Sequence, residues 1–96
     1  MKKHTVAKAQ ASVLAREGKI NLDYSLILTD RKECDLIEED TIYSVLILQT
    51  EGGITTEYDF LYDVARNEQN AVEILDLLVY NSVMPSNARD VLADYL

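Results

Sequence analysis

The chain has few of the residues that build reactive or cross-linked sites. It contains one cysteine, one histidine and no tryptophan. A lone Cys34 cannot form an internal disulfide, which weakly favours a reducing compartment. No CxxC, HxxxH or HExxH spacing occurs, so we expect no zinc site. His4 is the only imidazole base for a Ser or Cys nucleophile and lies near the chain end, so we predict a protein without catalytic residues, metal or cofactor.

Long apolar runs are also missing. The longest, residues 45–48, is far shorter than the roughly 20 residues of a membrane span. The basic start at Lys2 and Lys3 is not followed by the apolar segment of a signal peptide. A single domain over residues 1–96, in the cytoplasm and without membrane contact, is therefore expected.

Basic residues almost disappear after Lys32. The first 32 residues hold seven Lys and Arg against three acids, whereas the rest hold two Arg against fourteen Asp and Glu. The two parts thus have formal charges of +4 and −12, which give the net charge of −8. A field of this sign repels nucleic acid and anionic lipid and attracts basic proteins. This asymmetry predicts a partner more than a reaction.

Alternating apolar residues predict four strands in the first two-thirds of the chain. In residues 6–15, apolar side chains, mostly alanine, occupy the odd positions, and this alternation favours a strand. Because alanine has a high helix propensity, a helix remains the alternative for this segment. Residues 20–29 alternate cleanly, and both faces of residues 41–50 are apolar, as in a central strand. Gly52 and Gly53 suit a hairpin turn. A fourth strand from Ile54 to Phe60 is predicted to turn Tyr58 and Phe60 inward.

After Phe60 the apolar period becomes helical. Residues 67–82 have the pattern of an amphipathic helix with Asn67 as N-cap. Pro85 ends this helix and suits the start of a second, short helix that runs to Leu96. The predicted fold is therefore α+β: an antiparallel four-stranded sheet with two C-terminal helices packed on one face. The predicted core is Leu22, Tyr24, Leu26, Leu28, Leu46, Leu48, Tyr58, Phe60, Leu75, Leu78 and Leu92.

Acidic residues supply the candidate site. The segment that contains Asp35, Glu38, Glu39 and Asp40 lacks the order and the glycine of a calcium loop, so a solvated acidic loop is expected. Other acids could line one side of a nucleic-acid mimic, with a tyrosine as an anchor for the partner. This candidate partner-binding set is Glu51, Glu57, Asp59, Tyr62, Asp63, Glu68, Glu73 and Asp76. A simpler reading is that these charges only keep the protein soluble.

Three segments resemble a family of small uncharacterised Firmicutes proteins, chiefly clostridial. They are the strand at residues 43–47, the helix at residues 72–78, and the closing Val83-Met84-Pro85 followed by residues 89–96. The resemblance implies an architecture and a lineage, and no catalytic residues. In size and acidity the chain is also similar to phage-encoded inhibitors of CRISPR nucleases.

Two functional hypotheses follow. The first is a non-catalytic acidic module that docks on a basic protein, with inhibition of a nucleic-acid-binding protein as the natural case and no direct contact with nucleic acid. The second is a structural or regulatory homodimer joined through strand edges, with residues 6–15 as the candidate edge.

Overall fold

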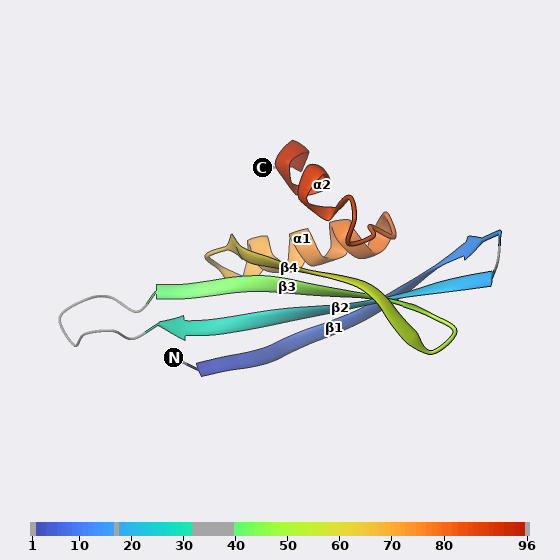
Figure 1. Cartoon of the computed structure of the whole chain (residues 1–96). Helices are drawn as coiled ribbons and strands as arrows, with labels where there is room; N and C mark the ends of the chain where they lie inside the picture. Colours follow the sequence, from blue (N-terminus) through green and yellow to red (C-terminus); the bar gives the residue numbers. More distant parts are fainter. Residues whose placement is uncertain (1, 17, 32–39, 96) are drawn as a thin grey trace.

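A computed structural model describes residues 2–16, 18–31 and 40–95. Four strands, β1 (Lys2–Ala15), β2 (Gly18–Arg31), β3 (Asp40–Glu51) and β4 (Ile54–Ala65), precede two helices, α1 (Glu68–Tyr80) and α2 (Ala88–Tyr95). The strands form one antiparallel sheet in the order β1-β2-β3-β4 (Figure 1). Both helices lie over the same face of this sheet (Figure 1). The predicted α+β architecture is confirmed.

The first segment is a strand, so the alternation of its residues decided its structure and the helix propensity of its alanines did not. Ala9 pairs with Tyr24 and Ala11 with Leu22. The small alanine side chains face the same side as these buried residues, and Ala7 and Ala11 pack against the core. Tertiary packing thus overrides intrinsic propensity here.

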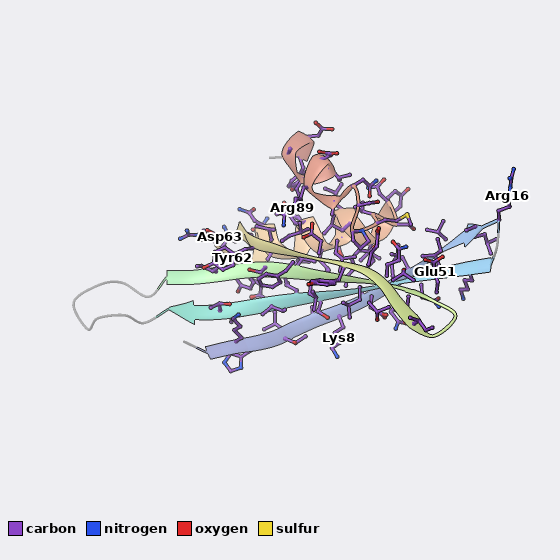
Figure 2. All side chains as sticks on the ribbon, viewed as in Figure 1. Lys8, Arg16, Glu51, Tyr62, Asp63 and Arg89 are labelled. Atoms are coloured by element: carbon purple, nitrogen blue, oxygen red, sulfur yellow. The ribbon has the colours of Figure 1, made fainter. Side chains whose placement is uncertain are left out.

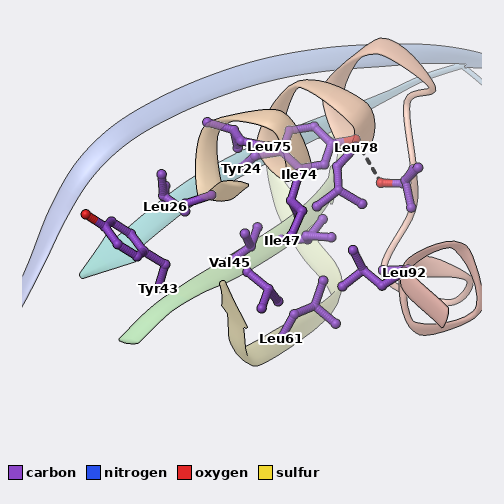
Figure 3. Packing of buried hydrophobic residues seen from close by; sticks show 14 of the residues in the cluster. Tyr24, Leu26, Tyr43, Val45, Ile47, Leu61, Ile74, Leu75, Leu78 and Leu92 are labelled. Carbon is purple, nitrogen blue, oxygen red and sulfur yellow. Dashed lines mark hydrogen bonds between the residues drawn. The ribbon is translucent and has the colours of Figure 1, made fainter. Parts of the chain in front are cut away.

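The helix-covered face of the sheet holds the main core. On β2 it presents Leu22, Tyr24 and Leu26, and on β3 it presents Val45 and Ile47, all fully buried (Figure 3). From α1 the buried side chains are Ala71, Ile74, Leu75 and Leu78, which share one side of the helix. Leu92 is the buried large side chain of α2.

Tyr24 fixes the sheet to the segment between the helices. Its hydroxyl donates a 2.8 Å hydrogen bond to the carbonyl oxygen of Val83, which lies 59 residues further along the chain. Desolvation by burial raises the pKa of Tyr24 to about 12. The ring therefore stays neutral at physiological pH and remains a hydrogen-bond donor.

β4 continues five residues beyond the predicted end at Phe60, through a bulge. The register shifts between Tyr43, which pairs with Ala65, and Val45, which pairs with Leu61. Within this bulge Asp63 has a positive φ of 56°, and its backbone N–H donates to the buried hydroxyl of Ser44 at 3.0 Å. A side-chain acceptor thus replaces the ladder bond that the extra residues disrupt. The sequence pattern alone gave no sign of this repair.

The inward face predicted for β4 is wrong. Leu61 is buried beneath the helices, whereas Phe60 is half-buried and Tyr58 is 71% exposed. Phe60 pairs with Leu46 and Tyr58 with Leu48, so all four side chains lie on the face away from the helices. Leu46 and Leu48 were also predicted as core and are only half-buried. The helices cover one face only, and period-two alternation cannot tell which face of an edge strand they cover.

The N-terminus of α1 follows the predicted signal, whereas the predicted start of the second helix at Pro85 is wrong, because residues 85–87 form a turn. Asn67 is the N-cap of α1, and its side chain accepts a hydrogen bond from the Asn70 backbone N–H at 2.9 Å. α1 ends at Tyr80, and Ser82 takes a positive φ of 48° that turns the chain. Pro85 precedes α2, which begins at Ala88. No helix in the described ranges is long and apolar enough to span a membrane.

Candidate functional site

The candidate residues fall into three places. Glu51 and Glu57 are exposed at the β3–β4 hairpin end of the sheet. Asp59, Tyr62 and Asp63 lie on β4 close to α2, while Glu68, Glu73 and Asp76 lie on α1. Figure 2 shows Glu51 well separated from Tyr62 and Asp63. The predicted set is therefore not a single surface.

Two of the three carboxylates on β4, Asp59 and Asp63, have internal counter-ions. Arg66 forms a bidentate salt bridge with Asp63, at 2.7 and 2.8 Å. Arg89 on α2 reaches back to Asp59 at 2.9 Å. Both arginines of the acidic part of the chain thus neutralise the β4 edge. These two acids are less suited than the helix acids to attract a basic partner.

Tyr62 lies next to this paired edge. Its side chain is 53% exposed and its ring centroid is 6.3 Å from that of Phe60. Strand alternation places both rings on the face of the sheet without helices. Tyr62 is therefore separated from the acids of α1 by the thickness of the sheet.

The acids of α1 differ from those of β4 in their ion pairing. Within the described ranges neither Glu68 nor Asp76 has a basic partner, and both side chains are exposed. Glu73 and Asp76 are three residues apart and are neighbours on the helix surface. Tyr80, four residues beyond Asp76, continues the same outward side and is 89% exposed. The outward side of α1 is thus an acidic stripe that ends in a tyrosine.

α2 adds a second tyrosine to this stripe. The hydroxyl of Tyr95 donates to Glu73 Oε2 at 3.3 Å. Partial desolvation, followed by the charge of Glu73 and this hydrogen bond, raises the pKa of Tyr95 above its ordinary value. Tyr95 is therefore a neutral donor that holds one carboxylate oxygen of Glu73. We define the helix patch as Val72, Glu73, Asp76, Tyr80 and Tyr95.

Sequence reasoning missed part of this patch. It gave Glu73 and Asp76, but the candidate set did not include Tyr80 or Tyr95. The available signal was helical spacing, since Tyr80 follows Glu73 by seven residues, which is two turns. The 39% exposure of Val72 at the edge of the patch adds apolar surface beside the charges.

Apart from Arg66 and Arg89, the described basic side chains lie on β1, β2 and the turn that joins them. Lys3 and Lys8 are exposed on β1, Lys19 is exposed on β2, and Arg16 is exposed in the connecting turn. Figure 2 shows Lys8 and Arg16 at a distance from the helices. The basic N-terminal strand therefore does not fold over the helix patch. Most of the described basic side chains thus lie away from the acids of α1.

Some sequence candidates fall outside this description. Cys34, Asp35, Glu38 and Glu39 lie in residues 32–39, outside the described ranges, and Asp40 is described only as the first backbone position of β3. His4 is exposed on β1. Among the described residues, no three His, Cys, Asp or Glu side chains are placed to hold a metal ion.

Comparison with protein families gives a lineage for this architecture. The family model described as "Family of unknown function (DUF6514)" matches residues 3–96. The chain belongs to this family. The match spans the sheet and both helices, so DUF6514 includes the whole fold described above. Comparisons with curated proteins and with solved structures returned no match.

Proposed function

We propose that this chain is a non-catalytic interaction module that docks on a basic protein through the helix patch. The observation that carries the proposal is the segregation of charge. Glu73 and Asp76 face outward from a helix without Lys or Arg. The described lysine side chains and Arg16 lie on β1, β2 and their turn, and the described arginines near the helices, Arg66 and Arg89, are paired with Asp63 and Asp59. Such an arrangement orients an incoming basic surface towards α1.

Tyrosines give the patch a means of binding beyond charge. Tyr80 and Tyr95 present rings beside the carboxylates, and tyrosine is enriched among the residues that dominate interface energies. Each ring supplies apolar contact area and a hydroxyl, with little side-chain entropy to lose. A surface of acids and aromatics fits a basic site that also holds bases or phosphates. A nucleic-acid-binding protein is the natural partner, and occupation of its site by an acidic mimic would inhibit it.

The test uses immobilised wild-type chain and a panel of basic nucleic-acid-binding proteins at low salt. Glu73→Gln combined with Asp76→Asn removes two charges from the patch, while Glu51→Gln combined with Glu57→Gln removes two charges at the hairpin end. We expect the first pair to weaken binding at least tenfold and the second pair to change it less than threefold. Binding should also fall steeply with salt and be displaced by a DNA duplex.

Two results would overturn the proposal. Equal losses from both pairs would mean that only net charge matters and that no patch exists. Binding that is unchanged by both double substitutions and persists in high salt would show that the interface lies elsewhere.

The structure also bears on the alternative of a homodimer through strand edges. β1 is an edge strand of fourteen residues, with one neighbour only, and within its described side chains Lys3 and Lys8 are its charged positions. An open edge of this length can pair with a second chain. Light scattering tests this alternative, because a strict monomer removes it. A lineage among clostridial Firmicutes also remains a proposal, which the genomes that encode DUF6514 members would test.

A further inference from the structure

The face of the sheet opposite the helices is apolar at its centre. Register places Leu46 beside Phe60 and Leu48 beside Tyr58 on this face, with Ile27 one strand away. Tyr62 continues the aromatic row of β4. We define the open face as Ile27, Leu46, Leu48, Tyr58, Phe60 and Tyr62, of which Tyr58 and Tyr62 are exposed and the other four are half-buried. Isolated exposed apolar residues are normal, but a contiguous group of this kind marks a contact surface.

The two edges of this face differ in chemistry. On the β1 side the row is polar and basic: Lys8 pairs with Ser25, and Gln10 pairs with Asp23 and hydrogen-bonds to it at 2.7 Å. On the β4 side the row is aromatic, in a strand that has three acids and no Lys or Arg. The chain itself shows how these edges interact, because Lys3 Nζ lies 5.8 Å from the centroid of the Phe60 ring. A lysine from β1 is therefore an established neighbour of the aromatic row.

We propose that a second copy of this chain covers the open face, and that the two sheets pack face to face. A two-fold axis parallel to the strands places β1 of each copy over β4 of the other, so that Lys8 of one copy meets the aromatic row of the other. An axis across the strands would instead oppose β1 to β1 and bring lysines together. The charge pattern selects the first arrangement.

The area of the whole face sets an upper limit for such a dimer, because Thr29, Ile42 and Ser44 at one end of this face are already buried. Four strands about 4.8 Å apart and roughly nine residues long give a face of roughly 600 Å² per copy, or about 1,200 Å² in total. This area is at the lower end of specific interfaces, so dimerisation in the micromolar range is expected. The hollow of about 520 Å³ between Lys8, Gln10, Ser25 and Leu48 leaves space for a side chain of the second copy.

A single-stranded nucleic acid is the competing occupant, since aromatic rows and lysines can also stack and bind bases. The formal charge of −8 disfavours it, because the field of the whole molecule repels phosphates. A second copy also carries a net charge of −8, but it brings Lys8 to the aromatic row without placing phosphate charges against the open face. The helix patch stays on the outside of both copies, so dimerisation leaves it accessible.

Sedimentation equilibrium over 1–200 µM tests the proposal with two variants that carry the same change. Tyr58→Lys places a cation opposite Lys8 of the other copy, whereas Tyr80→Lys makes this change on the helix patch, at a side chain that is also mostly exposed. We expect dimers for wild type and Tyr80→Lys, and at least a tenfold weaker dimer for Tyr58→Lys. Circular dichroism confirms that each variant folds, and Lys8→Glu provides a second variant with the same expected loss.

Four outcomes would overturn the proposal. They are a wild-type chain that is monomeric at 200 µM, a dimer that survives both Tyr58→Lys and Lys8→Glu, a dimer lost in Tyr80→Lys alone, and a monomer that binds a single-stranded oligonucleotide. Survival in both open-face variants would point to pairing through the β1 edge.

Discussion

Removing the Tyr24 hydroxyl tests the connection between the sheet and the helices. In Tyr24→Phe the ring stays in place, so no large cavity forms. The variant lacks only the hydroxyl that donates to the buried carbonyl oxygen of Val83. A buried carbonyl left without a donor costs about 1–3 kcal/mol. We therefore expect the free energy of unfolding to fall by about 1–3 kcal/mol, as measured by urea denaturation followed by circular dichroism.

The pH dependence of this difference is a sharper readout. Burial raises the pKa of Tyr24 from its ordinary value of 10.0 to about 12 in the folded chain. Between these values the folded chain keeps a proton that the unfolded chain releases, so the stabilisation is complete below pH 10 and is lost as pH rises towards 12. The difference between wild type and Tyr24→Phe should shrink by on the order of 1 kcal/mol between pH 8 and pH 11.

A matched control separates burial from loss of any tyrosine hydroxyl. Tyr80→Phe makes the same change at a side chain that is 89% exposed, so its stability should remain within about 0.5 kcal/mol of wild type. The reasoning fails if Tyr24→Phe is as stable as wild type at pH 7. It also fails if the difference between wild type and Tyr24→Phe stays constant up to pH 11.

Three further substitutions probe local contacts by the same denaturation assay. Asn67→Ala removes the N-cap of α1 and should destabilise the chain by about 1 kcal/mol, while Asn67→Ser should retain most of the stability. Ser44→Ala leaves the Asp63 N–H in the β4 bulge without its acceptor and should cost about 1–3 kcal/mol, with Ser44→Thr as the variant that keeps a hydroxyl. Arg89→Ala breaks the salt bridge to Asp59 at a mostly exposed side chain, so it should cost less than about 1 kcal/mol and no measurable amount in 1 M salt.

The order and type of all six elements could be predicted because each has a characteristic spacing of apolar residues and is bounded by turn or cap residues. Gly52 and Gly53 have positive φ in the hairpin turn, and Asn67 caps α1, as their residue types indicated. The face of β4 could not be predicted. Apolar residues occur on both faces of β3, so the alternation on β4 fits either side. Leu61 rather than Phe60 lies under the helices because of where α1 crosses the sheet, which is a long-range property.

The candidate site shows the same limit in another form. The prediction from the sequence identified the acids, but it placed Asp59 and Asp63 in the same binding set as Glu73 and Asp76. Only the fold brings Arg89 of α2 to Asp59, across thirty residues. Arg66 is near Asp63 in sequence, yet the bulge geometry sets the bidentate contact. Charge composition therefore predicts the sign of the charge on a surface. The ion pairs of the folded chain determine which of its charged residues are free to attract a partner.

The two proposed contact surfaces lie on different faces of the sheet, and their chemistry suits different partners. The helix patch carries uncompensated negative charge, which repels a second copy of the same patch and favours a basic protein. The open face has its own cation and its own aromatic row, and each can satisfy the other across a two-fold axis.

A dimer built in this way would display two helix patches pointing away from each other. Such a dimer would bind an extended or repeated basic partner more tightly than one patch can, because the second contact becomes intramolecular. Tyr58→Lys should then lower the apparent affinity for a repeated basic partner while leaving the affinity for a single-site partner unchanged. Equal losses for both kinds of partner would show that the two surfaces are not independent.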